Sequence, residues 1–219
     1  MYILLKKGLQ ANVNVTITYI YINKGKSVQK NATYALFGGS FDPPHLGHLE
    51  IIKKALELES VDKIIVMPTY LNPFKNSFSV EPKKRLAWAK EAFNLRGVEV
   101  SSFEIEQNRA VYTIESFKHL KKELNLKYII IGADNLKSIT KWSNFEYLNS
   151  QICWIVATRD GQKLELNSLR EYILLNISID VSSSEIRDGK KLEFLNKKIK
   201  SQVLLEYNIN NNINEDTNE

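Results

Sequence analysis

The sequence predicts an α/β protein with a doubly wound, mostly parallel sheet that carries helices on both faces. Short runs of β-branched and aromatic residues alternate with helical patterns along residues 32–207, which is typical of stacked βαβ units. The chain has 219 residues, of which 43% are hydrophobic, enough for one cored domain but too few for two. The longest apolar runs, such as 128–131 and 153–157, are far shorter than a membrane-spanning helix. We therefore expect one domain and no integral membrane protein.

The expected strands and helices follow one another in regular alternation. The strands are β-branched or aromatic runs, expected at Tyr34–Phe37, Lys63–Met67, Val98–Ser102, Tyr128–Ile131, Ile152–Val156 and Ile177–Asp180. The segments between them have helical patterns, at Leu46–Leu58, Pro82–Asn94, Thr113–Leu124, Asn135–Leu148, Ser184–Asp188 and Leu192–Tyr207. Pro82 suits a first helical turn, because its missing N–H costs nothing there. This order predicts a sheet that binds a ligand at the carboxyl ends of its strands.

The two ends of the chain differ in composition from the middle. Residues 12–22 alternate apolar and polar side chains and suit either an edge strand or hairpin arm, or a poorly ordered leader. Leu4 and Leu5 before two lysines do not supply the apolar region of a secretory signal. Residues 208–219 are rich in Asn and acidic residues, which predicts a solvated tail. We expect an N-terminal extension at 1–31, a domain at 32–207 and a polar tail at 208–219.

The charge distribution argues against a nucleic-acid partner. The formal net charge is +5. Residues 1–31 hold five lysines and no acidic residue, and the acidic and basic residues of 32–219 balance. A duplex-binding surface normally concentrates Lys and Arg on the folded domain. The single cysteine, Cys153, excludes an internal disulfide and a C-x-x-C zinc site, which fits a reducing, cytoplasmic setting.

The segment Tyr34 to Leu49 has the strongest chemical pattern in the chain. It runs from a strand through two glycines and a proline pair into a helix. Gly38 and Gly39 are expected to leave the strand through torsions closed to other residues and to approach a ligand without a Cβ. His45 and His48 are three apart, so they share one face of the first helical turn, where unpaired N–H groups attract anions. Two imidazoles beside these amides suit phosphoryl or nucleotidyl transfer. A lone histidine is more often a cap or a core residue, but this pattern favours binding.

Later polar positions fit the same chemistry and also have simpler interpretations. Ser183 and Ser184 open a helix, where hydroxyls and amides can meet phosphate oxygens, and the Arg187 guanidinium can grip a polyphosphate. The simpler interpretation is a serine N-cap beside a surface arginine. Asp134 follows a buried-looking strand, where its carboxylate can accept from ribose hydroxyls or cap a helix. Trp142 suits either ring stacking or ordinary core packing.

The residues G-G-S-F-D-P-P-H-L-G-H, at 38–48, resemble the signature of the H-x-G-H nucleotidyltransferase superfamily, and in detail that of nicotinate-nucleotide adenylyltransferases. Four further blocks match in the same order and extend the resemblance over about residues 33–207; they lie at 67–75, 109–114, 132–142 and 181–187. Two positions depart from the common pattern. Phe74 stands where many members have His, and Val111 where Ser is usual. Both positions lie in blocks that, by the resemblance, contact the mononucleotide rather than ATP.

The resemblance implies a Rossmann-like fold and an enzyme that joins ATP to nicotinate mononucleotide, giving deamido-NAD and pyrophosphate. It implies direct attack on the ATP α-phosphorus, with Mg²⁺ carried by the ATP phosphates and no metal held by the protein. His45 and His48 are the expected catalytic pair. The remaining expected contacts are, for ATP, Gly38, Gly39, Ser40, Phe41, Gly132, Asp134, Ser183, Ser184 and Arg187, and, for the mononucleotide, Lys75, Tyr112, Thr113 and Trp142.

Several alternatives remain at this point. The same chemistry suits nicotinamide mononucleotide or phosphopantetheine as acceptor, and a nucleotide-binding regulator or an RNA-binding module using the basic leader is a more distant possibility. Lys75 in a polar loop is as often solvated as functional. His119 is expected at the surface, Cys153 in the core, and 83–85 (Lys-Lys-Arg) on a solvated helix face.

Overall fold

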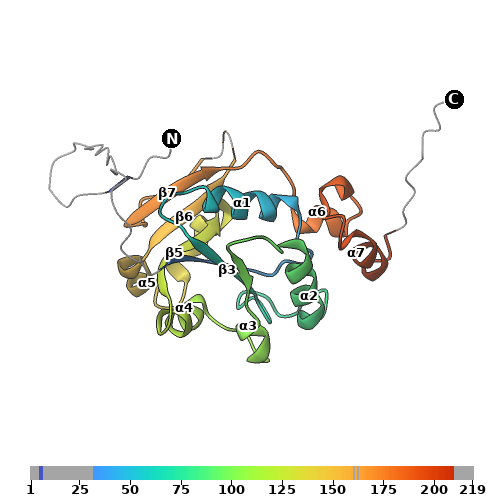
Figure 1. Cartoon of the computed structure of the whole chain (residues 1–219), viewed down its shortest axis with the longest axis horizontal. Helices are drawn as coiled ribbons and strands as arrows, with labels where there is room; N and C mark the ends of the chain where they lie inside the picture. Colours follow the sequence, from blue (N-terminus) through green and yellow to red (C-terminus); the bar gives the residue numbers. More distant parts are fainter. Residues whose placement is uncertain (1–4, 7–31, 160, 162, 210–219) are drawn as a thin grey trace.

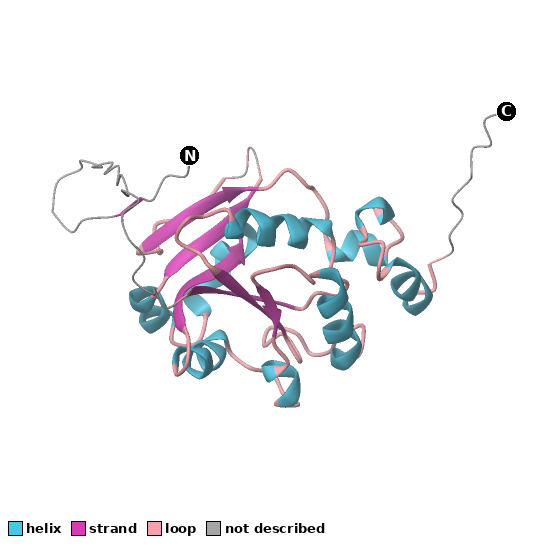
Figure 2. Cartoon of the chain, viewed as in Figure 1, coloured by secondary structure: helices cyan, strands magenta, loops and turns pink. Residues whose placement is uncertain are grey.

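A seven-stranded sheet forms the centre of the molecule (Figures 1 and 2). The computed structural model describes residues 5–6, 32–159, 161 and 163–209. The strand order is β1-β7-β6-β5-β2-β3-β4, in which only β1 pairs antiparallel with its neighbour. The strands are β1 Leu5–Lys6, β2 Thr33–Gly39, β3 Lys63–Pro68, β4 Val98–Val100, β5 Asn125–Gly132, β6 Cys153–Thr158 and β7 Glu171–Asn176.

The order of the six parallel strands creates one crevice in the middle of the sheet. The chain enters at β2, moves outward through β3 and β4, and then returns to the other side of β2 with β5, β6 and β7. β2 and β5 are therefore neighbours whose following segments diverge, with Phe37 opposite Ile130. A ligand crevice is expected outside the carboxyl ends at such a point. β2 ends there at Gly39 and β5 at Gly132.

Helices cover both faces of the sheet, which confirms the expected doubly wound class. They are α1 Leu46–Leu56, α2 Pro82–Ala92, α3 Phe103–Glu106, α4 Thr113–Lys121, α5 Phe145–Gln151, α6 Ser183–Arg187 and α7 Lys200–Glu206, with 3₁₀ helices η1 Ala133–Lys141 and η2 Leu192–Phe194. α1, α2 and α7 share one hydrophobic cluster with Phe37 and Ile130; α4, η1 and α5 share the other with Leu36 and Ile129. Neighbouring strand residues thus point to opposite cores, as the pleat requires.

The expected strand at Ile177–Asp180 is wrong, because the sixth parallel strand is β7, which ends at Asn176. The backbone N–H groups of Ser178 and Ile179 donate instead to the Glu50 carboxylate of α1, at 3.0 and 2.8 Å. The Ser178 hydroxyl, these two N–H groups and Lys54 all donate to the carboxylate and lower the pKa of Glu50 to about 2. A side chain from a helix thus takes the hydrogen bonds that a neighbouring strand would otherwise supply, and ties α1 to this segment.

Two expected helices are each interrupted. The segment predicted as helix Asn135–Leu148 is η1 followed by α5, and Asn144 between them adopts a left-handed conformation with φ of 55°. The segment predicted as helix Leu192–Tyr207 is η2 followed by α7, separated by the loop 195–199. The short helix α3 was not expected, and the third strand ends at Val100 rather than Ser102.

Arg85 contradicts the prediction that 83–85 form a solvated face. Its side chain is only 1% exposed, while Lys83 and Lys84 are exposed. The guanidinium donates to four backbone carbonyls, those of Val80, Ser40, Thr69 and Tyr70, at 2.6–3.0 Å. A planar group with five N–H donors can satisfy such a set, which an ammonium cannot match. Arg85 therefore joins the loop after β2 to the loop after β3.

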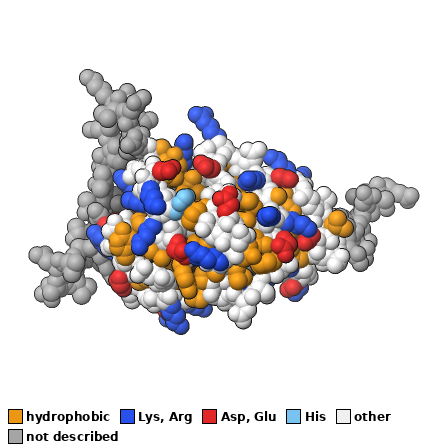
Figure 3. All heavy atoms as spheres, turned by 90° about the horizontal axis from the view of Figure 1, so that it is seen from below, with side chains coloured by type: hydrophobic (Ala, Val, Ile, Leu, Met, Phe, Trp, Pro, Cys, Tyr) orange, Lys and Arg blue, Asp and Glu red, His pale blue; other side chains and the backbone are white. Residues whose placement is uncertain are grey.

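Only parts of the two chain ends belong to the described structure. The expected strand or leader at 12–22 lies outside the described residues, as does the tail from 210 onward. Ile209, expected in that tail, donates its N–H to Leu204 at 2.9 Å and closes α7. Across the described part, we find no helix with the length and apolarity needed to cross a bilayer. On the face in Figure 3, Lys and Arg side chains are interspersed with Asp and Glu rather than gathered in one patch.

Candidate active site

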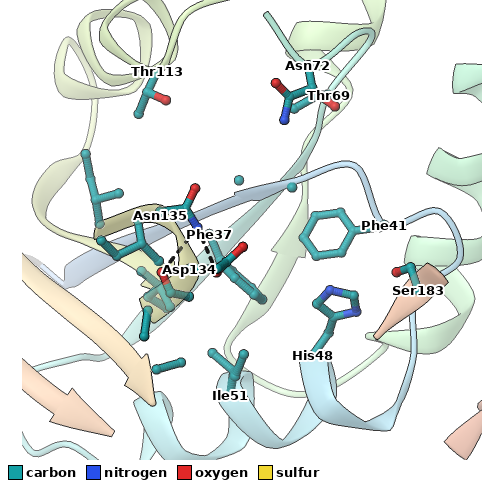
Figure 4. A pocket seen from close by; sticks show the side chains of 18 of the residues that line it. Phe37, Phe41, His48, Ile51, Thr69, Asn72, Thr113, Asp134, Asn135 and Ser183 are labelled. Atoms are coloured by element: carbon teal, nitrogen blue, oxygen red, sulfur yellow. Dashed lines mark hydrogen bonds between the residues drawn. The ribbon is translucent and has the colours of Figure 1, made fainter. Parts of the chain in front are cut away.

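A cavity of about 550 Å³ opens at the carboxyl ends of β2, β5 and β6. The starts of α1 and α6 line one part of it, and the loop after β3 and the start of α4 line another. Figure 4 shows His48 and Ser183 together on one side, Asp134 and Asn135 on the other, and Thr113 across from Asn72 at the far end. The volume lies within the range of pockets that enclose small-molecule substrates.

His45 and His48 begin helix α1 by capping each other. The His48 N–H lies 3.4 Å from His45 Nδ1, and the His45 N–H lies 3.3 Å from His48 Nδ1. The two rings stack with centroids 3.7 Å apart. Both line the cavity. The capping role, one of the two alternatives left by the sequence, is therefore confirmed, and the binding role stays a prediction for two side chains that line the cavity.

Burial keeps both imidazoles neutral, and the capping hydrogen bonds fix their tautomers. Desolvation, and after it the charge of Arg159, lowers the pKa of His45 to about 3. Desolvation and the neighbouring His45 lower the pKa of His48 well below its usual value. Because each Nδ1 accepts a backbone N–H, each neutral ring carries its proton on Nε2. Two Nε2–H donors are therefore available beside the positive end of α1.

The glycines of this region act differently from what was expected. Gly38 and Gly39 are the last residues of β2, and the left-handed turn falls on Phe41, with φ of 47°. A Cβ on Gly38 would meet nothing within 4 Å, so this position leaves open space beside the cavity. Close packing explains the glycine at position 47, since a Cβ there would lie 3.1 Å from both His45 Nδ1 and Val181 Cγ1. Gly47 therefore protects the ring geometry of the pair.

The late serine-arginine block contributes two of its three serines to the cavity lining, and not its arginine. Ser182 caps α6, with its hydroxyl oxygen accepting from the Glu185 N–H at 3.2 Å, and both Ser182 and Ser183 line the cavity. Ser184 and Arg187 are not among the lining residues. Arg187 donates to Ser184 Oγ at 3.0 Å and to the carbonyl of Asp42 at 2.6 Å, which holds the loop before α1. Ser40 also lies outside the lining.

Asp134 and Trp142 stand at the two ends of η1. Asp134 is exposed and lines the cavity together with Gly132 and Asn135. It does not cap η1, and its Oδ1 accepts from Asn135 Nδ2 at 3.2 Å. Trp142 lines the cavity and also packs edge-on against Trp154, with centroids 6.0 Å apart. Packing is therefore confirmed for Trp142, and stacking on a ligand ring stays a prediction.

The far end of the cavity holds most of the expected mononucleotide residues. Tyr112 and Thr113 line it at the start of α4, and Val111 lies beneath them, buried. Lys75 is exposed and is not a lining residue. Its neighbour Phe74 does line the cavity and is 63% exposed. An apolar phenyl ring thus stands at a position where the resemblance predicts an imidazole.

Several lining residues were missed by sequence reasoning. Arg159 follows β6 and lines the cavity beside the histidines; it pairs with Asp180 at 2.6 Å. Its place just after a strand was a usable signal. Thr69, Asn72 and Glu104 also line the cavity. Within residues 32–159, 161 and 163–209, no three His, Cys, Asp or Glu side chains gather where they could hold a metal ion.

Comparisons with known proteins agree with this geometry. A family model described as cytidylyltransferase-like matches residues 36–189. A probable nicotinate-nucleotide adenylyltransferase of Sulfurovum sp. is 44% identical over 176 residues, 80% of this chain and 94% of the relative. One of Campylobacter fetus is 48% identical over 157 residues, 70% of this chain and 84% of the relative.

A solved structure supports the fold. The nicotinic acid mononucleotide adenylyltransferase of Plasmodium falciparum, complexed with NaAD, superposes with a TM-score of 0.68 at 21% identity, covering 81% of this chain and 97% of that one. At this identity the likeness concerns the fold alone. The sequence relatives confirm the resemblance found in the motifs: the chain belongs to the nicotinate-nucleotide adenylyltransferase family.

Proposed function

We propose that the protein joins ATP and nicotinate mononucleotide to give deamido-NAD and pyrophosphate. The observation that carries this proposal is the stacked His45–His48 pair at the start of α1, because both neutral imidazoles line a cavity shared with Ser183 and Asp134. The family membership and the names of the relatives support the same substrates.

The geometry suggests how this chain performs the reaction. The mononucleotide phosphate attacks the α-phosphorus of ATP in line, and the bond to the bridging oxygen breaks as pyrophosphate leaves. His45 and His48 donate to phosphate oxygens from Nε2, and Arg159 adds positive charge nearby. Preorganised donors of this kind stabilise charge that develops in the transition state. Asp134 accepts from a ribose hydroxyl at the opposite side of the cavity.

We propose that Mg²⁺ accompanies ATP rather than occupying a site of the protein. Among the described residues, Asp134 is the only acidic one that lines the cavity apart from Glu104, which is bonded to Ser116 of α4. A single carboxylate does not make a cage, and Mg²⁺ commonly binds through substrate phosphates. When bound, the ion neutralises phosphate charge. We place the reaction in the cytoplasm, because the chain's lone cysteine indicates a reducing setting.

A pyrophosphate-release assay tests the proposal. ATP is supplied with nicotinate mononucleotide, nicotinamide mononucleotide or phosphopantetheine in parallel reactions. We expect the highest kcat/KM with nicotinate mononucleotide, and deamido-NAD as its product. The variant His48→Ala should fold and lose about 10²- to 10³-fold in kcat, the typical cost of one preorganised donor. A kcat within threefold of wild type would remove His48 from the mechanism, and turnover only with phosphopantetheine would overturn the assigned acceptor.

A further inference from the structure

Two buried polar atoms in the cavity lack a hydrogen-bond partner. Among the buried side-chain nitrogen and oxygen atoms of the described residues, Thr69 Oγ1 and Glu104 Oε2 are the two without one. Both residues line the cavity. Native proteins leave few buried polar atoms unsatisfied, because each has lost its contacts with water. Two such atoms around one cavity point to a polar group of a ligand.

Glu104 lies beside the first turn of α4. Its side chain is 5% exposed, and its Oε1 accepts from Ser116 Oγ at 2.6 Å. Ser116 and the lining residue Thr113 are three apart on α4, so they share a face of that helix. In Figure 4, Thr69 lies across the cavity from Thr113. The two unpartnered oxygens therefore belong to the part of the cavity that holds Tyr112 and Thr113, the residues expected to contact the mononucleotide.

The surroundings of Glu104 favour a protonated carboxyl. Burial, together with the charge of Glu115, raises the pKa of Glu104 to about 7. Glu115 is itself paired with Arg109 at 2.7 Å, and this cation is exposed and directed to Glu115. The other titratable groups nearby are Glu106 on α3 and His119, whose ring stacks on Phe103 at 3.9 Å. No described cation donates a hydrogen bond to Glu104.

We propose that Glu104 determines the choice between nicotinate and nicotinamide acceptors by donating a hydrogen bond from Oε2 to the carboxylate of the pyridine ring, with the Thr69 hydroxyl as second donor. This inference rests on the proposed function. A carboxylate only accepts hydrogen bonds, and so it satisfies both donors. A carboxamide has one oxygen and one NH2 group, so when its oxygen accepts from one donor, its NH2 group faces the other. An ionised Glu104 reverses the preference, because it repels the carboxylate and accepts from the amide.

The test compares kcat/KM for nicotinate and nicotinamide mononucleotide between pH 6 and 8.5. Both acceptors carry the same phosphate, so its titration cancels in the ratio. For the wild type, the nicotinate-to-nicotinamide ratio should fall on the order of tenfold as Glu104 ionises. Glu104→Gln keeps an N–H donor at every pH, so its ratio should remain high and flat. Glu106→Gln, an exposed neighbour on α3, should follow the wild type.

Two outcomes would overturn the proposal. One is a Glu104→Gln ratio that follows the wild type at every pH. The other is a wild-type ratio that does not change with pH, which is informative even if the variant fails to fold. Thr69→Val should lower kcat/KM for nicotinate mononucleotide about tenfold and keep the pH dependence; an unchanged value would also count against it. A wild type that adenylylates neither acceptor would instead contradict the proposed function itself.

Discussion

At the scale of single residues, His45 combines a structural and a chemical role. Its Nδ1 caps α1 and the residue lines the cavity, so the sequence correctly paired it with His48 but did not show that the two side chains cap each other's backbone. The motif was visible because its residues are close in sequence. The role of Glu104 was not visible, because an acidic residue in the run F-E-I-E is typical of a protein surface. In the folded chain Glu104 is buried, and its carboxyl group accepts a hydrogen bond from Ser116 of α4.

The lowered pKa of His45 makes stability depend on pH. In the unfolded chain this imidazole binds a proton below about pH 6.5, whereas the folded protein holds it neutral down to about pH 3. The unfolded state therefore binds more protons in this window, and the free energy of unfolding decreases as the pH falls from 6.5 toward 3.

Replacing His45 by Asn removes this contribution and retains a capping side chain. Between pH 7 and pH 5, urea unfolding should show that His45→Asn loses about 2 kcal/mol less stability than the wild type. The exposed His119 provides the control, since His119→Asn should lose as much as the wild type. Equal losses in all three proteins would mean that His45 is not kept neutral by folding. Glu104 also titrates in this pH range, but it does so in all three proteins, so its contribution cancels when their losses of stability are compared.

At the scale of elements, contacts distant in sequence explain where the predicted boundaries fail. The centres of β2, β3, β5 and β6 were predictable, because buried parallel strands are continuous apolar runs. The segment after β7 has a similar composition, and only the Glu50 carboxylate shows why it is not a strand. A local sequence pattern cannot indicate a hydrogen-bond partner that lies 128 residues away in the chain.

Arg85 is the clearest case at this scale, because one side chain of α2 holds two loops. Arg85→Met should lower the free energy of unfolding by at least about 2 kcal/mol, since it leaves four carbonyls without their donor. Lys83→Met, on the exposed side of the same helix, should change it by no more than about 0.5 kcal/mol. Urea unfolding of the two variants checks this, and similar small effects would show that the loops do not depend on Arg85.

At the scale of the whole molecule, the alternation of strands and helices was sufficient to predict the doubly wound sheet and the edge that carries the site. It was not sufficient to predict which polar residues reach the cavity. Lys75 and Arg187 match family motifs yet lie outside the lining, while Arg159 and Thr69 lie within it. Side-chain direction depends on how the loops pack against each other, which motif spacing does not contain.

The lining of the cavity also predicts the effect of removing residues 1–31. Every described lining residue falls between Leu36 and Ser183, and the family model begins at residue 36. A chain starting at residue 32 should therefore keep kcat and both KM values within about twofold of the full chain. The pyrophosphate-release assay on both chains measures this. A loss of more than tenfold in kcat would show that residues 1–31 take part in catalysis.

The reciprocal caps of α1 have a consequence for how this site tolerates mutation. A substitution at either imidazole by a side chain that cannot cap removes the proposed ligand contact and, in the same step, frees a backbone N–H at the start of the helix. We expect such a change to lower both turnover and stability. Selection on enzyme activity and selection on fold integrity therefore converge on one pair of side chains.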